Sequence, residues 1–439
     1  MPEPSVAVSK KSRGDERRFI HAADLHLDSQ LKGLEAYEGA PVDRLRNATR
    51  VAFENLIALA IDEQVDFVVI AGDLFDGKWT DQQTGLWTAA KFRQLERAGI
   101  DVYLIRGNHD AAAEVRQRVQ WPPNVHEFPT DAPGTFLHEP TGIALHGQGF
   151  SQRETTIDLA AGYPLAIEGK FNVGLLHTSL TGDPNHDSYA PTREETLVSK
   201  GYDYWALGHI HTQRRIRERP FIAYSGCTQG RHIHESGVKG CFLVTVRNEK
   251  AVVQFRELDA IRWQLVEATA PPEGPMSELY DVIRQRLEQA RASADGRFVA
   301  VRLVVTGQTA CHRDLNAPNG HDDAVIQIRD LANSLDQVWV EKIQFQTQPR
   351  VDVARLRESP DLLGELLRSL QALTEASDEE LVQTFKDETS SLGTKAGLEL
   401  RECDINLSDP ELIRRWLCDA ENLLVARLAE PAGETASVN

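Results

Sequence analysis

The chain has 439 residues and five cysteines, and its formal net charge is −18. The length predicts two or three domains, and the charge argues against a protein that coats nucleic acid through a uniformly basic surface. The odd cysteine count without CxxC spacing, together with the absence of a signal-peptide core or an apolar run of about 18–20 residues, argues against disulfide frameworks and membrane spans and predicts a cytoplasmic protein.

The first long segment, residues 18–262, follows a tail at residues 1–17 that we expect to be disordered. Amphipathic stretches at Asp43–Gln64 and Asp81–Ala98 predict helices, and Gly99 suits the end of the second one. Short apolar runs around these helices predict buried strands. Because strands and helices alternate, we expect a layered α/β domain.

The end of this domain carries a predicted hairpin. Residues Phe221–Gly240 are rich in glycine and turn-forming residues. They lead into two apolar segments, Cys241–Val246 and Ala251–Phe255, which are joined by a short polar turn. We expect these two strands to form a hairpin that closes a second sheet.

A second, smaller α/β unit is predicted for residues 263–350, where the pattern starts again after a proline-rich loop. The expected elements are a strand at Trp263–Glu267, a helix at Met276–Ala292, a strand at Phe298–Val305, a helix at Asp322–Leu335 and a strand at Val338–Phe345. This unit contains no cluster of metal-ligand side chains.

Residues 351–429 are predicted to be helical, before a disordered tail at residues 430–439. Leu362–Leu373 and Pro410–Leu428 carry leucine-rich apolar faces at helical spacing. The apolar face of Pro410–Leu428 has two interpretations, which are packing within its own chain and docking onto a partner.

Five apolar runs in the first domain each lead into side chains of metal-ligand type. These side chains are Asp24 and His26, Asp73, Asn108, His177, and His209 and His211. Ligands at the ends of neighbouring strands can converge on one rim of a sheet. Seven Asp, Asn and His side chains can hold two divalent metals. This is the arrangement of two-metal hydrolases, in which the metals stabilise both the attacking and the leaving oxygen of a phosphoryl displacement.

The individual motifs differ in how specific they are. Asp73 can bridge two metals, but an aspartate at this position can also cap a helix. His177 alone is a weak signal, because a single histidine after an apolar run is usually a buried structural residue. In GNHD, His109 follows Asn108 directly, and we expect it to lie beside the metals as a general acid or charge stabiliser.

A local basic surface is predicted next to the GHIH segment. Its candidate residues are Arg214, Arg215, Arg217 and Arg219, with Arg116 and Arg118 after GNHD and Arg231 further along. These arginines could contact DNA despite the negative total charge. The alternative is that they form a solvated loop edge.

The order DxH, GD, GNHD, a single His and GHxH resembles the calcineurin-like metallophosphoesterase superfamily over roughly residues 18–262. The resemblance implies a two-layer β-sandwich flanked by helices and a dinuclear centre, with manganese as the favoured metal. It implies that the first metal is held by Asp24, His26, Asp73 and His211. It implies that the second is held by Asp73, Asn108, His177 and His209.

The segment from Tyr224 to Cys241, with GDLFD and LGHIH, is similar to SbcD-type DNA repair exonucleases and, within them, to the YhaO-like branch. That similarity implies a small α/β capping domain, a helical C-terminal region and an SMC-type ATPase partner with a coiled coil, and leaves a homodimer open. The leading hypothesis is a manganese-dependent DNA exonuclease or endonuclease in DNA repair. The alternatives are a phosphodiesterase for a nucleotide or other small molecule, and a regulatory scaffold for an ATPase.

Overall fold

The computed structural model describes residues 16–29, 39–77, 82–111, 119–180, 190–350, 353–395 and 406–428. The chain divides into two compact units, Met1–Leu265 with Arg291–Val301, and Val266–Ala290 with Arg302–Asn439. The tails predicted to be disordered fall almost wholly outside the described residues. Among the described residues, no helix is long and apolar enough to cross a membrane.

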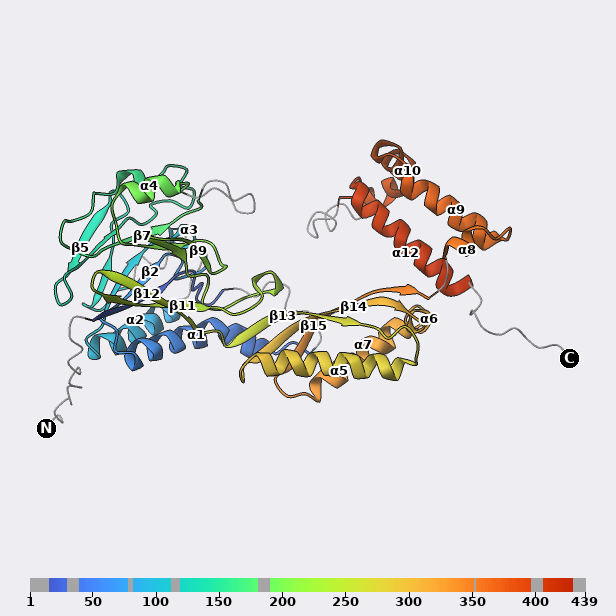
Figure 1. The fold of residues 1–439 in the computed structure, drawn as a ribbon, viewed down its shortest axis with the longest axis horizontal. Helices are drawn as coiled ribbons and strands as arrows, with labels where there is room; N and C mark the ends of the chain where they lie inside the picture. Colours follow the sequence, from blue (N-terminus) through green and yellow to red (C-terminus); the bar gives the residue numbers. More distant parts are fainter. Residues whose placement is uncertain are drawn as a thin grey trace. The chain divides into compact units, whose positions relative to one another are not determined.

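The first unit contains two six-stranded sheets (Figure 1). The first sheet has the order β12-β11-β1-β2-β3-β4, formed by Lys250–Glu257, Gly240–Arg247, Arg17–Ala22, Phe67–Ala71, Asp101–Ile105 and Val125–Glu127. The second has the order β5-β6-β7-β8-β10-β9, formed by Gly134–His138, Ile143–Gly147, Asn172–His177, Tyr204–Gly208, Phe221–Tyr224 and Arg214–Glu218. The predicted sandwich with flanking helices is confirmed.

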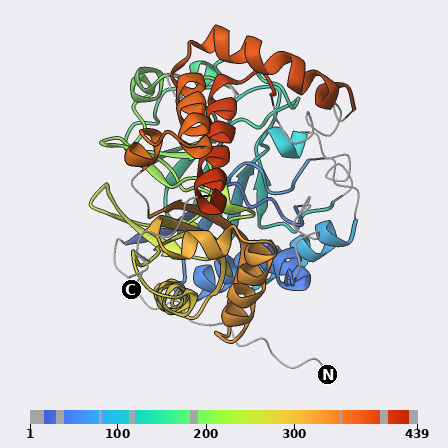
Figure 2. The same ribbon diagram turned by 90° about the vertical axis from the view of Figure 1, so that its right-hand side faces the viewer.

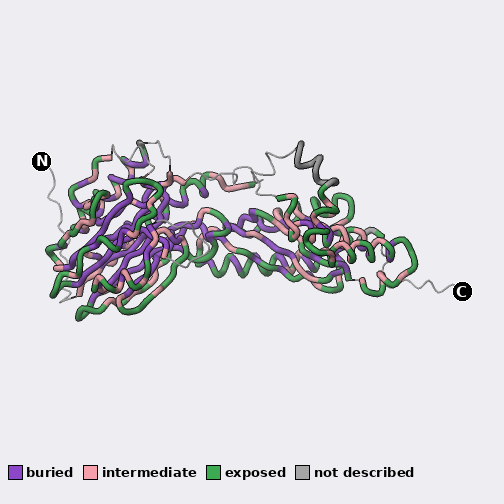
Figure 3. The backbone as a smooth tube through the Cα atoms, turned by 90° about the horizontal axis from the view of Figure 1, so that it is seen from above, coloured by how far each residue is buried: buried purple, intermediate pink, exposed green. Residues whose placement is uncertain are grey.

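Burial on both faces of the strands explains the layering. In β1, Phe19 belongs to the core between the two sheets, whereas Ile20 belongs to the core beneath the helices. Those helices are α1 (Val42–Asp62) and α2 (Gln82–Arg97), which contribute Phe53 and Phe92. Strands covered on both faces read as continuous apolar runs, which is the pattern seen in the sequence. Figure 3 shows the resulting concentration of buried positions along these strands.

The predicted hairpin forms, but its predicted place was wrong. β11 pairs antiparallel with β12 and also with β1, so the hairpin extends the first sheet and does not close the second. The alternation of β11 explains this placement, because Phe242 and Val244 face the core between the sheets while Leu243 faces the helix-side core. Next to β1, the strand therefore contributes side chains to both hydrophobic cores, one on each face of the first sheet.

The three-stranded sheet lies mostly in the second unit and has the order β13-β14-β15, formed by Ile261–Thr269, Phe298–Thr309 and Val338–Pro349. Helices α5 (Met276–Ser293) and α7 (Gly320–Asn333) cover one of its faces (Figure 1, Figure 2). The predicted order of strands and helices is therefore present. One short helix, α6 (Cys311–Leu315), was not predicted.

The C-terminal helices of the second unit pack on one another. They are α8 (Val353–Arg357), α9 (Leu362–Glu375), α10 (Asp378–Lys395) and α12 (Pro410–Leu428). Ile413 and Leu417 of α12 are buried against Leu381 of α10, and Val425 is buried against Leu367 of α9. Of the two interpretations of Pro410–Leu428, packing within the chain is therefore the one that the buried face supports.

Candidate metal centre

The seven predicted ligand side chains all lie where strands of both sheets end. Asp24 and His26 follow β1, Asp73 follows β2 and Asn108 follows β3, and these three strands run parallel. From the second sheet, His177 ends β7, and His209 and His211 follow β8, which is parallel to β7. The carboxyl ends of parallel strands share one edge, so seven side chains from distant sequence positions meet there.

The backbone at this edge is unusual. Asp24, His26, Asp73 and His209 have φ values of 52°, 44°, 53° and 99°. Non-glycine residues rarely adopt such conformations, and clusters of them are characteristic of functional sites. The loops are held in place by hydrogen bonds from Asp24 N to Gly72 O (3.1 Å) and from His26 N to Asp73 O (3.0 Å).

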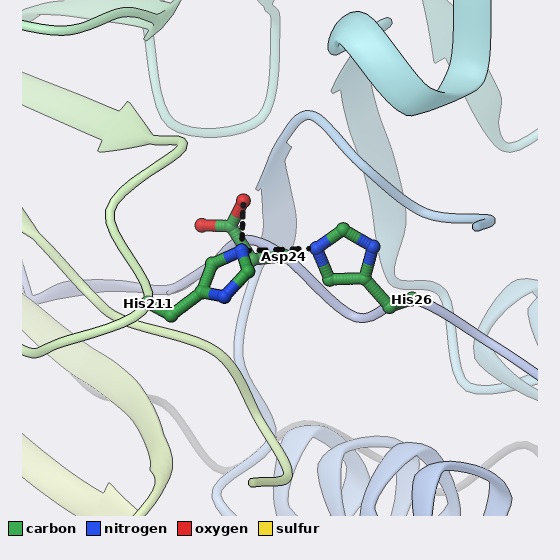
Figure 4. A group of neighbouring side chains, drawn as sticks. All are labelled: Asp24, His26 and His211. Atoms are coloured by element: carbon green, nitrogen blue, oxygen red, sulfur yellow. Dashed lines mark hydrogen bonds and ion pairs between the residues drawn. The ribbon is translucent and has the colours of Figure 1, made fainter. Parts of the chain in front are cut away.

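One group of donor atoms is formed by Asp24, His26 and His211 (Figure 4). The Nε2 atoms of His26 and His211 face each other at 3.1 Å, and Asp24 Oδ1 lies 3.8 Å from His211 Nε2. Two facing imidazole nitrogens beside a carboxylate form a good set of metal ligands.

The other group surrounds His177. Its Nε2 lies 2.9 Å from Asn108 Oδ1 and 3.4 Å from Asp73 Oδ2. Asp73 Oδ2 is also 3.8 Å from His26 Nε2, so the Asp73 carboxylate lies between the two groups. The ring of His209 lies 5.2 Å from that of His177. Asp73 therefore occupies the position that a bridging ligand requires.

The donor set fits divalent metal ions. Asp24, Asp73 and His177 offer atoms within 4.8 Å of one another, as do Asp24, His26 and His211. All donors are nitrogen or oxygen, which suits manganese, iron or zinc and not a thiolate site. The carboxylates of Asp24 and Asp73 are almost completely buried, and buried charges of this kind are normally paired or bound to metal.

Burial and charge pairing set the protonation of these ligands. Burial lowers the pKa of His26 to about 3, so its imidazole is neutral and able to bind metal. Burial alone would also lower the pKa of His177, but the adjacent Asp73 carboxylate outweighs it and raises that pKa to about 9. A proton on His177 thus compensates the Asp73 charge, and a cation bound there would replace this proton.

His109 lies beside the donor groups. Its backbone N–H donates to Asp73 Oδ1 (2.9 Å), and its ring lies 4.8 Å from that of His26. Its Nδ1 lies 2.7 Å from Asp76 Oδ1. Burial would lower the pKa of His109, but the hydrogen bond to Asp76 outweighs it and raises the pKa. With Nδ1 occupied, Nε2 is the atom left to exchange a proton with a substrate.

Asp76 is a site residue that the sequence reasoning missed. Besides His109, it accepts a hydrogen bond from Ser29 Oγ (2.6 Å), and its Oδ1 lies 3.6 Å from His26 Nδ1. Carboxylates in this position fix the tautomer and orientation of the histidines they contact. The available signal was the second aspartate of GDLFD.

We expect Asp76→Asn to lower turnover by roughly 10–100-fold, the usual scale for losing a carboxylate that orients a ligand or catalytic histidine. Ser29→Ala, which removes the hydrogen bond from the hydroxyl to Asp76 but keeps the Asp76 carboxylate, should have a much smaller effect. The measurement is a double-mutant cycle with His109→Ala on a small diester. If Asp76 acts through His109, adding Asp76→Asn to His109→Ala should cost little more; fully multiplicative losses would contradict that role.

The remaining residues of GNHD build the loop. Asp110 accepts hydrogen bonds from the backbone N–H groups of Leu74, Phe75 and Gly107. A Cβ atom at Gly107 would collide with Asp73 Oδ1 and with the Asp73 backbone nitrogen. Glycine is therefore required here because the two ligand loops approach each other closely.

The candidate DNA-contacting arginines fall in two different settings. Arg214, Arg215 and Arg217 are exposed on β9, the edge strand that begins shortly after His211, and Arg219 is exposed after it. Arg217 pairs with Glu194 at 2.7 Å. By contrast, Arg231 is mostly buried and pairs with Glu235. Arg116 and Arg118 lie outside the described residues.

Comparison with known proteins identifies the family. The family model for calcineurin-like phosphoesterases matches residues 17–213, and that for the middle domain of metallophosphoesterase YhaO matches residues 263–348. The uncharacterized metallophosphoesterase YhaO of Bacillus subtilis is 34% identical over 344 residues, covering 77% of this chain and 84% of that protein. The chain belongs to the calcineurin-like phosphoesterases. The resemblance stated from the motifs is thus confirmed, and the protein is a phosphoester hydrolase.

More distant relatives share part of their length with this chain. The DNA double-strand break repair protein Mre11 of Methanopyrus kandleri is 25% identical over 219 residues, covering 45% of each chain. The Mre11 protein of Methanosarcina mazei is 25% identical over 283 residues, covering 62% of this chain and 43% of that protein. A dimetal phosphatase structure from Danio rerio covers 55% of this chain and 96% of its own, with 11% identity and a TM-score of 0.32.

Proposed function

We propose that this phosphoesterase is a manganese-dependent DNA nuclease that acts in DNA repair. The observation that carries the proposal is the His109–Asp76 pair, held 2.7 Å apart beside the clustered nitrogen and oxygen ligand atoms of Asp24, His26, Asp73, His177 and His211. A DNA phosphodiester has an alkoxide leaving group, which needs a proton donor, and His109 offers one through Nε2. The four described free cysteines suit the reducing cytoplasm.

The predicted ligands would form two metal sites that share Asp73. Asp24, His26, Asp73 and His211 would hold one cation, and Asp73, Asn108, His177 and His209 the other. Two such cations would stabilise the charge on the phosphoryl oxygens and lower the pKa of a water molecule. Asp73 also accepts a hydrogen bond from the backbone N–H of His109. The same carboxylate therefore lies among the metal ligands and positions the residue that would donate a proton.

The similarity to the two Mre11 proteins supports DNA as the substrate, and the exposed arginines of β9 provide a candidate contact surface. An SMC-type ATPase with a coiled coil is part of the same proposal. Because Ile413, Leu417 and Val425 of α12 are buried within the chain, such a partner would have to bind other surfaces.

The test is incubation of purified protein with manganese and end-labelled single- or double-stranded DNA, beside bis(p-nitrophenyl) phosphate. Cleavage of DNA that Asp73→Asn lacks would support the nuclease. Hydrolysis of the small diester without DNA cleavage would favour the small-molecule phosphodiesterase. Failure on both substrates with two manganese ions bound would favour the scaffold.

Replacing Arg214, Arg215, Arg217 and Arg219 together with Gln should weaken DNA binding and flatten its salt dependence. Each arginine that neutralises a phosphate contributes about 0.9 to the slope of log affinity against log salt. Turnover on the small diester should barely change, because the donor cluster is untouched. The matched control replaces four other exposed arginines of the first unit, Arg93, Arg97, Arg153 and Arg247. Equal slopes in the two quadruple variants would assign the β9 arginines to a solvated edge.

A further inference from the structure

The glycine-rich segment Ser225–Gly240 wraps around His211. The backbone oxygen of His211 accepts hydrogen bonds from Cys227 N (3.2 Å) and from Lys239 Nζ (3.2 Å). A Cβ atom at Gly226 would press against Gln213 N and His211 O, so glycine permits this close approach. Residues near the beginning and near the end of this segment therefore both hold the backbone oxygen of His211.

The same segment also holds the His211 side chain. His211 Nδ1 lies 2.6 Å from Glu235 Oε1, at a distance where the ring N–H donates to the carboxylate. With the proton on Nδ1, the lone pair of Nε2 points toward His26 Nε2 and Asp24 Oδ1. Glu235 itself is only 5% exposed, so its carboxylate is shielded from water.

Arg231 locks the Glu235 carboxylate in place. Its backbone N–H donates to Oε2 (2.8 Å), and its guanidinium donates to Oε1 (2.8 Å) and to Oε2 (3.3 Å). The guanidinium also lies 3.9 Å from Asp76 Oδ2 and 3.4 Å from Ser29 Oγ. One arginine thus contacts both carboxylates that orient histidines of the site, Glu235 behind His211 and Asp76 behind His109.

We propose that Glu235 is a positioning residue that presents His211 to one of the two metals, and that Arg231 holds Glu235 in the required orientation. This inference rests on the proposed metal centre. Histidine ligands are normally oriented by a carboxylate on their other ring nitrogen, and losing that carboxylate typically weakens metal affinity or activity by about 10–100-fold. Because Glu235 contacts His211 and not His177, the loss should fall on one metal and spare the other.

The test is isothermal titration calorimetry, in which manganese is added to metal-free wild type, Glu235→Gln and Arg231→Lys. We expect wild type to bind two equivalents. Glu235→Gln should bind one equivalent with wild-type affinity and the second about 10–100-fold more weakly. Arg231→Lys keeps the charge but loses the two-point contact, so it should weaken the same equivalent by a smaller factor. Raising the manganese concentration should restore turnover on the small diester in both variants.

Glu63→Gln is the matched control, because Glu63 also pairs with two arginines, Arg18 and Arg256, but lies away from the donor cluster. It should leave both affinities unchanged. Two wild-type equivalents in folded Glu235→Gln, or equal weakening of both with a lower Tm and no rescue by metal, would overturn the inference. If Glu235→Gln does not fold, Arg231→Lys decides by the same criterion.

The two proposals fail separately. A wild type that binds fewer than two equivalents would overturn the metal centre and the inference with it. The nuclease proposal alone would be overturned by a different result. In that case wild type binds two equivalents of manganese but leaves DNA intact, while Glu235→Gln still shows the selective loss of affinity for one equivalent.

Discussion

Asp73→Asn is expected to release both metals and to abolish hydrolysis while the fold is retained. The Asp73 carboxylate lies between the two donor groups, 3.4 Å from His177 Nε2 and 3.8 Å from His26 Nε2, so its loss affects both. We expect turnover to fall by roughly 10³-fold or more. Losing a single preorganised hydrogen-bond donor to a developing oxyanion already costs about 10²–10³, and Asp73 acts on both metals. The measurement is bound manganese by inductively coupled plasma, with circular dichroism to verify the fold.

Asn is the better substitution because Asp73 has a φ of 53°, which Asn tolerates and Ala does not. The matched control is Asp295→Asn, since Asp295 has a φ of 52° but is exposed. It should keep both metals and full activity. Two full equivalents of manganese in folded Asp73→Asn would show that Asp73 does not bridge the metals.

His109→Ala should show a different pattern, with both metals retained and turnover lowered by roughly 10²–10⁴, the scale for losing a general acid or base. The reason is that His109 Nδ1 is held by Asp76, while Nε2 is available to a leaving group. Nitrophenolate leaves with little protonation, so bis(p-nitrophenyl) phosphate should lose less activity than DNA. The measurement is the ratio of these two losses.

His321→Ala, at an exposed histidine of the second unit, is the control and should change neither rate. Loss of metal from His109→Ala would instead make His109 a ligand, a role open to it because its ring groups with His26 and Asp73 within 4.8 Å. Equal losses on the two substrates would argue against proton donation.

The elements that bring the donors together were predictable because each follows from local sequence. The apolar run of β2 is followed two residues later by Asp73, and that of β7 ends in His177. The carboxyl ends of such strands meet wherever neighbouring strands run parallel. Sequence alone left Asp73 open as a helix cap and His177 as a structural histidine. In the structure both side chains lie in the donor cluster, with Asp73 between its two groups.

What the sequence did not predict depends on contacts between distant residues. Glu235 is 24 residues from His211, and no spacing rule connects them. The β11–β12 hairpin was predicted from its local pattern, but its sheet is decided by pairing with β1, more than 200 residues earlier. Likewise, the leucine-rich face of α12 was visible in the sequence, whereas its burial against α9 and α10 was not.

The most direct test of the nuclease proposal is the rate of manganese-dependent cleavage of end-labelled double-stranded DNA by wild type and by Asp73→Asn at equal concentration. We predict labelled products from wild type that require manganese, and none above background from Asp73→Asn. Intact DNA after incubation with wild type carrying two manganese ions, or equal cleavage by the two proteins, would contradict it.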